Sequence, residues 1–266
     1  MTRKLMVVTG ASAGIGATFA RSYAARGWDL ALTARRADRL EALAAELKTA
    51  HGATSLVIPA DLADPAAPQA ILAAITAQGR VVDGVVNNAG YGLGGTFART
   101  SWADQAAFIQ VLVTAVAELT HRTVPGMMER KFGRIINVAS LAGILPGSSG
   151  HTLYSAAKAF VIKMSQSVNL ECQGTGVHVT ALCPGLTYSE FHDVNGTRGQ
   201  LQALPKWLWQ DSDAVVEAAI AANEANEATV VTGGPNRAMA TIAKLAPERL
   251  LLSIMRSQSA RFRRMD

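Results

Sequence analysis

The chain has 266 residues, of which 49% are hydrophobic and 6% aromatic, with 25 Lys and Arg against 20 Asp and Glu. Much of the net charge of +5 lies at the C-terminus, in Arg256, Arg261, Arg263 and Arg264. We expect no nucleic-acid binding, because no basic face with interleaved aromatic residues or known reading motif is present. No apolar run approaches the ~18 residues of a membrane span, so we expect no membrane-spanning helix.

Cysteine and histidine usage narrows the class of protein further. Cys172 and Cys183 lack metal-ligand spacing, and two cysteines do not make a disulfide framework. No pair of the five histidines has metal spacing, and no metal is assigned. Residues 1–4 lead directly into an apolar strand-like run, so no signal peptide is expected. These observations favour a soluble protein of the reducing cytoplasm.

Short apolar runs alternate with helical stretches along the whole chain. The predicted strands are Leu5–Val8, Leu30–Thr33, Ser55–Ile58, Val81–Val86, Ile135–Ala139, Val177–Cys183 and Thr229–Thr232. Between them, Arg36–Ala50 is typical of the helices, because Leu40, Leu43 and Leu47 form one apolar face. The alternation predicts an α/β fold, a doubly wound parallel sheet covered by helices on both faces. No linker divides the chain, so residues 1–266 are expected to form one domain.

The first predicted strand ends in a glycine-rich turn, Thr9–Gly16, with the sequence TGASAGIG. Glycines let the backbone approach a pyrophosphate, and the start of the following helix favours its negative charge. The spacing Gly-x-x-x-Gly-x-Gly differs from the general dinucleotide fingerprint Gly-x-Gly-x-x-Gly. The turn therefore predicts a nucleotide phosphate site, with a purely structural turn as the alternative.

Tyr154 and Lys158 are four residues apart and share one helix face. A lysine ammonium in this position can stabilise the phenolate of a tyrosine, whose pKa is ordinarily ~10. General acid or base work at neutral pH needs such help. The alternative for this pattern alone is a solvated pair on a helix surface.

These motifs occur together with Asn87-Asn88-Ala89-Gly90, Ser140 and Pro184-Gly185, in a fixed order along the chain. In this combination the chain resembles the short-chain dehydrogenase/reductase family, over roughly residues 4–235. The resemblance implies a Rossmann-type fold, a nicotinamide cofactor and hydride transfer at a carbonyl or alcohol carbon. It makes Tyr154 the general acid of ketone reduction, Lys158 the residue that lowers its pKa and binds the nicotinamide ribose, and Ser140 the group that orients the substrate oxygen.

The resemblance also implies a set of cofactor-binding residues at the carboxyl ends of the strands. They are Gly10, Ser12, Ala13, Gly14, Ile15, Gly16, Arg35, Arg36, Asp61, Leu62, Asn88, Ala89, Gly90, Tyr154, Lys158, Pro184, Gly185, Leu186 and Thr187. Arg35 stands where NAD-preferring relatives carry Asp, and an arginine accommodates the 2′-phosphate of NADP. We therefore expect NADP(H), with an ordinary surface arginine pair as the alternative.

One position departs from the family. The fourth catalytic residue of the family is usually an asparagine that helps hold a water in a proton relay from the lysine, and Leu112 stands at that site. Leucine has no hydrogen-bonding atoms in its side chain. We expect activity with an altered relay or pH dependence.

Two further features of the sequence concern the substrate. Leu186–Gln210 is the least periodic segment and is interpreted as a substrate loop, with an ordinary surface excursion as the alternative. Apolar residues in the variable loops favour an apolar carbonyl or alcohol substrate, whose identity the sequence does not reveal. His151 precedes Tyr154 by three residues and is interpreted as a helix-start or solvent-facing residue, with substrate contact as the alternative.

Beyond Gly233-Gly234 the chain adds a helical extension at about 236–266. Because such an extension can cover the edge of the last strand, we expect a homodimer through the helices around 103–131 and 152–173 rather than a tetramer. A cover for the substrate site and a membrane-surface contact are the alternatives for the extension.

The leading hypothesis for function is an NADPH-dependent oxidoreductase that interconverts a ketone or aldehyde and an alcohol, with Tyr154 as general acid and base. A C=C or imine reductase on the same fold is the first alternative. The second, motivated by Leu112, is a redox-inert NADP(H)-binding module.

Overall fold

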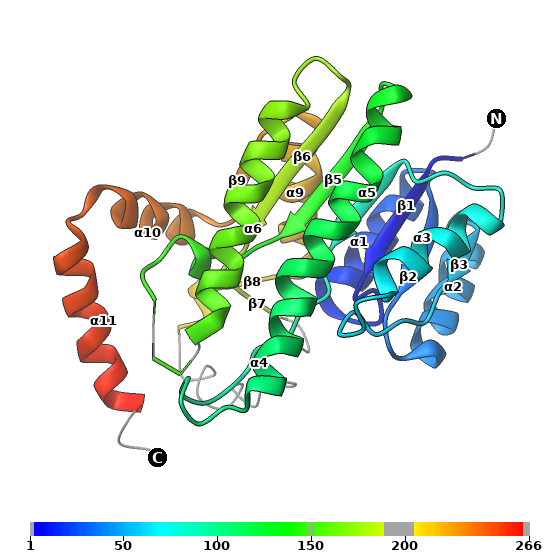
Figure 1. The fold of residues 1–266 in the computed structure, drawn as a ribbon. Helices are drawn as coiled ribbons and strands as arrows, with labels where there is room; N and C mark the ends of the chain where they lie inside the picture. Colours follow the sequence, from blue (N-terminus) through cyan, green and yellow to red (C-terminus); the bar gives the residue numbers. More distant parts are fainter. Residues whose placement is uncertain (1–2, 148, 151, 189–204, 263–266) are drawn as a thin grey trace.

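The structure, a computed structural model, describes residues 3–147, 149–150, 152–188 and 205–262. Seven parallel strands form one central sheet in the order β3-β2-β1-β4-β5-β6-β9 (Figure 1). The strands are β1 (Leu5–Thr9), β2 (Asp29–Thr33), β3 (Ser55–Val57), β4 (Gly84–Asn87), β5 (Gly133–Val138), β6 (Val177–Cys183) and β9 (Thr229–Val231). Each overlaps a predicted apolar run, so the Rossmann-type fold class and the single domain are confirmed. The fourth run was placed too early, because Val81 is 54% exposed and β4 begins only at Gly84.

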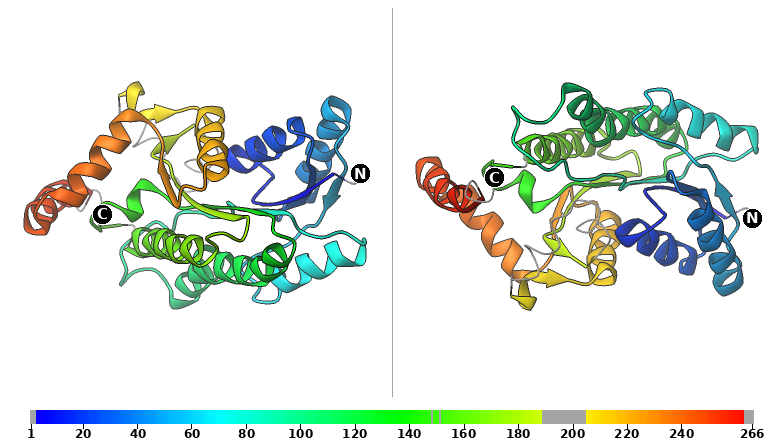
Figure 2. Two further views of the ribbon diagram at one scale, coloured as in Figure 1. Left: turned by 90° about the horizontal axis from the view of Figure 1, so that it is seen from above. Right: turned by 90° about the horizontal axis from the view of Figure 1, so that it is seen from below.

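Helices cover both faces of the sheet, as Figure 2 shows in views from above and from below. The helices are α1 (Gly14–Ala25), α2 (Ala37–His51), α3 (Ala67–Ala77), α4 (Trp102–Ile109), α5 (Ala115–Glu129), α6 (Thr152–Glu171), α9 (Ser212–Glu224), α10 (Gly234–Leu245) and α11 (Glu248–Phe262). Helices α1, α2 and α9 lie on one face, and α3 to α6 lie on the other. Both faces of the strands are therefore buried, which explains why the strands are continuous apolar runs in the sequence.

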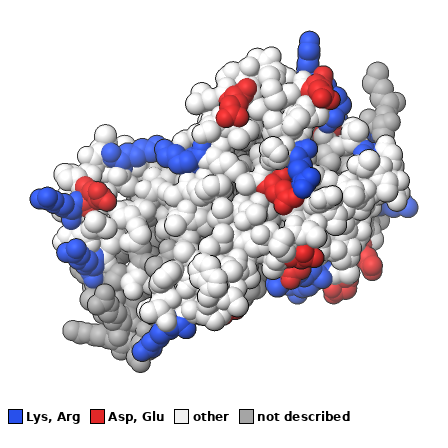
Figure 3. Space-filling view, in the orientation of Figure 1, with Lys and Arg blue, Asp and Glu red and all other residues white. Residues whose placement is uncertain are grey.

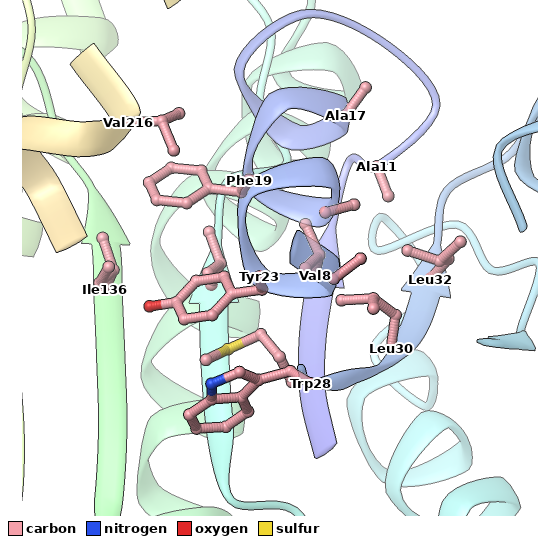
Figure 4. Packing of buried hydrophobic residues seen from close by; sticks show 14 of the residues in the cluster. Val8, Ala11, Ala17, Phe19, Tyr23, Trp28, Leu30, Leu32, Ile136 and Val216 are labelled. Carbon is pink, nitrogen blue, oxygen red and sulfur yellow. The ribbon is translucent and has the colours of Figure 1, made fainter. Parts of the chain in front are cut away.

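The core on the α1 face is built around aromatic side chains (Figure 4). Phe19 and Tyr23 of α1 stack with ring centroids 6.4 Å apart, and Trp28 meets Tyr23 edge-on at 5.3 Å. Val216 of α9 and Ile136 of β5 belong to the same cluster. Burying each such side chain contributes roughly 1.5–3 kcal/mol, so this cluster fixes α1, and with it the glycine-rich turn, against the sheet.

A π-helical turn, η1 (Gln110–Thr114), joins α4 to α5. Such a turn contains more residues than an α-helical one, and π-turns are frequent at functional sites. The sequence pattern does not predict this turn, because the apolar spacing of Val111 and Leu112 is compatible with an ordinary α-helix.

Two short strands join the ends of the predicted substrate loop. β7 (Leu186–Thr187) and β8 (Trp209–Gln210) pair in parallel, and Tyr188 stacks on Trp209 with ring centroids 5.0 Å apart. Residues 189–204 and His151 lie outside the described residues, so the predictions for them stay predictions.

The amide of Gln210 connects this small sheet to the start of α10. It lies 3.0 Å from Asn236 Nδ2, and Asn236 Nδ2 donates to the Thr232 carbonyl at 2.8 Å. A Cβ atom on Gly185 would collide with the Asn236 side chain, so the two residues are in close contact. Asn236 thereby contacts both the end of β6 and β8.

Helices α10 and α11 point away from the sheet at the C-terminal end of the described chain (Figures 1 and 2). The residues of β9 are partly buried, and the expectation that the extension covers this edge stays a prediction. Within the described part of the chain, no helix has the length and apolar character needed to cross a membrane.

Candidate active site

The predicted site residues follow the carboxyl ends of neighbouring strands. The strand order reverses between β1 and β4, and ligands of doubly wound sheets bind at this kind of switch point. The motif at 10–16 follows β1, Asn88–Gly90 follows β4, Ser140 follows β5 and Pro184–Thr187 follows β6. The topology thus brings these motifs to one edge of the sheet.

The glycine-rich turn packs directly against the motif that follows β4. Gly10 has φ +66°, and a Cβ atom there would lie 2.8 Å from Asn88 Nδ2 and 2.9 Å from the Ala89 Cα. A Cβ atom on Gly16 would collide with the Gly10 carbonyl oxygen. Both positions therefore require glycine, Gly10 because of its left-handed backbone and its neighbours, and Gly16 because of the close approach.

Thr9 fixes this packing, a role that the sequence interpretation did not assign. Its Oγ1 accepts hydrogen bonds from the backbone N–H groups of Asn88 and Ala89, both at 2.9 Å. Asn88 Nδ2 donates in return to the Thr9 carbonyl at 3.0 Å. The sequence signal for this role of Thr9 is a polar residue at the end of an apolar run, directly before the glycine-rich turn.

The start of α1 is suited to an anion. Its N-cap residue, Ala13, supplies no side-chain cap, and the first turn has no acidic residue. The first N–H groups of a helix have no partner within the helix, and the helix dipole adds positive potential there. A phosphate at this point would be held by backbone groups.

Arg35 and Arg36 lie beside this helix start, after β2. The Arg36 guanidinium donates to Ser12 Oγ at 3.0 and 3.3 Å, which joins the arginine pair to the glycine-rich turn. Arg35 is exposed. Asp61, after β3, accepts a hydrogen bond from the Ala63 N–H at 3.0 Å. Its carboxylate therefore stabilises a local turn, and it is also a predicted cofactor contact.

Ser140 and Tyr154 are brought together by two different elements. Ser140 caps the short 3₁₀ helix η2 (Leu141–Gly143), where its Oγ accepts from the Ala142 N–H at 3.1 Å, and Tyr154 lies in the first turn of α6. Their hydroxyl groups are hydrogen-bonded to each other. Burial raises the pKa of Tyr154 to about 12, and the bond to Ser140 acts in the opposite direction.

Lys158 lies one turn further along α6 and is buried. Its Nζ donates to the Val138 carbonyl at 2.7 Å and lies 5.7 Å from the Tyr154 ring centroid. Burial lowers the pKa of Lys158 to about 8, against the opposing influence of Cys183. Desolvation is the dominant influence on the pKa of both groups in this structure, and the lowering of the tyrosine pKa by Lys158 stays a prediction.

Gly143 allows η2 and α6 to approach each other. A Cβ atom at this position would lie 2.6 Å from the Lys158 carbonyl carbon and 2.7 Å from the Ala159 nitrogen. The nearby Leu141 N–H donates to the Pro184 carbonyl at 2.9 Å. Ser140 is therefore held between α6 and the end of β6, and the sequence interpretation missed the part that Gly143 plays.

Leu112 lies in the π-helical turn η1, is 1% exposed and packs against Gly90. The departure from the family pattern is thus located beside the predicted cofactor motif. The side-chain Nε2 of the preceding Gln110 is buried without a hydrogen-bond partner within the described residues.

A small cavity of about 10 Å³ borders Tyr154. Its lining includes Leu93, Phe108 and Gln105, and Gln105 is only 3% exposed. Such a volume admits about one water molecule. Within the described chain no group of three or more His, Cys, Asp and Glu side chains is placed to hold a metal ion.

Comparison with known proteins places the chain in a family. The family model described as short chain dehydrogenase matches residues 4–198. The chain is 38% identical over 183 residues to the NADP-dependent 3-hydroxy acid dehydrogenase YdfG of Salmonella typhi, a match that covers 68% of this chain and 72% of that protein.

Two solved structures are similar over most of both chains. A short-chain dehydrogenase from Sphingobium yanoikuyae in complex with NADPH is 33% identical with a TM-score of 0.78, covering 86% of this chain and 87% of that one. The bulky-bulky ketone specific alcohol dehydrogenase from Comamonas testosteroni is 26% identical with a TM-score of 0.75, covering 98% and 94%. Because the family model matches well over half of its length, the chain belongs to the short-chain dehydrogenase/reductase family of oxidoreductases.

Proposed function

We propose that this chain is an NADP(H)-dependent oxidoreductase that interconverts a ketone or aldehyde and an alcohol. The observation that carries the proposal is the hydroxyl pair of Ser140 and Tyr154, with Lys158 one helical turn away. This arrangement lies at the same sheet edge as the glycine-rich turn. The proposed acid and the proposed nucleotide site would thereby be adjacent, which is what hydride transfer to a carbonyl requires.

The residues present fit a dinucleotide cofactor. The glycine turn is a cradle that a Cβ atom would fill, and the first turn of α1 offers N–H groups to a pyrophosphate. Arg35, exposed beside Ser12 and Arg36, would bind a 2′-phosphate through charge-assisted hydrogen bonds. Asp61, Leu62, Asn88–Gly90 and Pro184–Thr187 are the remaining proposed contacts. When bound, the nicotinamide supplies or accepts the hydride.

Tyr154 is the proposed proton donor during reduction. As hydride reaches the carbonyl carbon, negative charge develops on the substrate oxygen, and a positioned donor stabilises that charge better than water does. A pKa of about 12 keeps the proton on Tyr154 at neutral pH, so the group is present in its acid form. In the direction of oxidation, the phenolate accepts the proton of the alcohol.

Ser140 and Lys158 have supporting roles in this proposal. The Ser140 hydroxyl, already bonded to Tyr154, would orient the substrate oxygen toward the same proton. Lys158 is held by Val138 with its Nζ near the tyrosine ring, where it can bind the nicotinamide ribose and stabilise the phenolate as the proton leaves. Leu112 cannot hold a relay water through its side chain, so proton resupply must use another route.

The proposal is tested by NADPH consumption with hydrophobic ketones, diketones and imines, alongside direct NADPH titration. We expect turnover with ketones. Turnover with imines alone would move the assignment to an imine reductase. Binding without any turnover would favour the redox-inert module that the buried Leu112 suggests.

A homodimer through α4, α5 and α6 belongs to the same proposal. Exposed apolar side chains lie on these helices, including Trp102, Phe160 and Leu170 at 70%, 43% and 70% exposure. Figure 3 shows few charged side chains across the middle of this face. Light scattering of the full chain tests the dimer. Residence in the cytoplasm and an apolar substrate stay predictions from the sequence.

A further inference from the structure

The net charge of the chain is carried entirely by its last part. Residues 234–266 contain seven of the 25 Lys and Arg and two of the 20 Asp and Glu, which gives this stretch a formal charge of +5. Residues 1–233 contain the remaining eighteen of each and are formally neutral. Figure 3 shows basic side chains at the end of the molecule where α10 and α11 lie, with an acidic side chain among them.

The same two helices expose large apolar side chains. Ile242 and Leu245 of α10 are 59% and 81% exposed, and Leu250 and Leu252 of α11 are 56% and 37% exposed. Ile242 and Leu245 are three residues apart and share one face of their helix. Leu250 follows just beyond the turn at Pro247, so the aliphatic residues gather around the elbow between the helices.

Basic residues flank this elbow. Lys244 and Arg249 are exposed next to Leu245 and Leu250, and Arg256 is exposed two turns beyond Arg249 on the same side of α11. We use the name basic elbow for residues 237–256, which combine these cations with the exposed aliphatic side chains.

The part of the protein that the structure describes leaves the large aliphatic side chains of the basic elbow uncovered. Both helices point away from the sheet (Figure 1), and Ile242, Leu245, Leu250 and Leu252 remain solvent-exposed although Ala240 is buried. A helix of fifteen residues such as α11 is marginal alone in water and depends on burying its apolar face. We therefore expect the exposed apolar side chains of the elbow to be buried by a binding partner.

We propose that the basic elbow docks on the surface of an anionic lipid bilayer. Exposed aliphatic side chains flanked by Lys and Arg are the composition with which helices bind in the plane of a charged membrane surface. A second copy fits less well, because two extensions of +5 repel each other and the rest of the chain carries no net charge to attract them. The contact is peripheral.

The test uses the full-length protein and sedimentation with two kinds of vesicle, phosphatidylcholine alone and phosphatidylcholine mixed with phosphatidylglycerol. We expect binding to the anionic vesicles only, weakening as salt is added. Arg256→Glu removes one attraction and adds a repulsion, so binding should fall roughly tenfold or more. Leu245→Asn with Leu250→Asn should lower it by a similar factor, because the apolar contact is lost.

Matched controls use exposed residues far from the elbow. Lys48→Glu, at the end of α2, makes the same charge change as Arg256→Glu, and Val81→Asn makes an exposed apolar residue polar. Neither is expected to change vesicle binding. Circular dichroism and NADPH titration report whether each variant keeps its fold.

Three outcomes would overturn the proposal. The first is a wild-type protein that does not sediment with anionic vesicles at low salt. The second is equal loss of binding in Arg256→Glu and Lys48→Glu, which would show a general effect of charge. The third is unchanged vesicle binding by Leu245→Asn with Leu250→Asn together with a smaller assembly in light scattering, which would assign the elbow to a second copy.

Discussion

Two corners of the proposed active site differ in the solvent exposure of their charged side chains. The catalytic corner, Ser140, Tyr154 and Lys158, is shielded by η2 and α6, and burial shifts the pKa of Tyr154 and of Lys158 in opposite directions. In the phosphate corner, Ser12 and Arg36 are partly buried, as Ser140 and Tyr154 are, but the charged side chain of Arg35 is exposed whereas that of Lys158 is buried. If the proposed roles are right, the comparison teaches that reactivity would depend on desolvation in one corner and cofactor choice on solvated charge in the other.

The strongest test of the catalytic corner is Tyr154→Phe. Loss of the proton donor should lower ketone reduction on the order of 10²-fold or more, while NADPH binding is retained. Steady-state NADPH consumption and a binding titration measure the two effects. Tyr23→Phe is a matched control, because it removes a buried hydroxyl in the core under α1 and should leave turnover unchanged. Full turnover by Tyr154→Phe would remove this residue from the mechanism.

Burial of Lys158 predicts a pH-dependent stability. An unfolded lysine keeps its proton up to about 10.5, whereas folded Lys158 loses it near 8, so the unfolded state binds more protons between these values. The stability of the wild type relative to Lys158→Met should therefore rise with pH, by roughly 1.4 kcal/mol per unit and about 3 kcal/mol in total. Urea unfolding across this range measures it.

Lys163→Met is the control for this prediction, because Lys163 is an exposed lysine of the same helix. Its stability difference from the wild type should stay constant over the same pH range. Parallel curves for Lys158→Met and the wild type would contradict the proposed desolvation of Lys158.

The phosphate corner is tested by Arg35→Asp. A charge-assisted contact to the 2′-phosphate becomes a repulsion, so the preference for NADPH over NADH should fall roughly tenfold to a hundredfold, with little change in kcat. The ratio of kcat/KM for the two cofactors is the measurement. Lys48→Asp, an exposed cation at the other end of α2, serves as the control. An unchanged ratio would show that the phosphate is recognised elsewhere, for instance by Arg36.

The smallest effect on rate is expected for Leu112→Asn. A side-chain amide beside Gly90 should shift the pH profile of reduction, with a change in turnover of less than about tenfold. Burying an amide with incomplete hydrogen bonding should destabilise the fold by about 1–3 kcal/mol. Leu119→Asn, the same change at a buried site in the following helix α5, should cause the instability without the pH shift. Identical pH profiles for Leu112→Asn and the wild type would show that proton resupply does not depend on this position.

The sheet could be predicted from the sequence because buried parallel strands are apolar along their whole length. Leu5–Thr9 and Val177–Cys183 are visible for this reason. β7 and β8 could not be predicted, because two-residue strands leave no periodic pattern. The π-helical turn was equally hidden, since the choice between α and π hydrogen bonding depends on packing that spacing does not record.

The candidate site was predictable where chemistry depends on residue type and spacing, as for Tyr154 and Lys158. The direction of the Tyr154 pKa shift was not, because desolvation depends on the elements that surround the hydroxyl in the fold. Gly143 and Thr9 were missed for a related reason. Their importance lies in contacts to residues distant in the sequence, and nothing in their own neighbourhood marks those contacts.

Asn236 offers a route for thermodynamic linkage between helix α10 and the proposed cofactor site. It contacts Gly185 at the end of β6 and lies 3.0 Å from the Gln210 amide of β8, and it belongs to the first turn of α10. A displacement of α10 must therefore disturb the strand end proposed to flank the nicotinamide. If a bilayer shifts this contact, it changes the affinity for the cofactor, and the cofactor changes the affinity for the bilayer by the same factor. Titration of the cofactor with and without vesicles, and of vesicles with and without the cofactor, would measure this coupling in one protein.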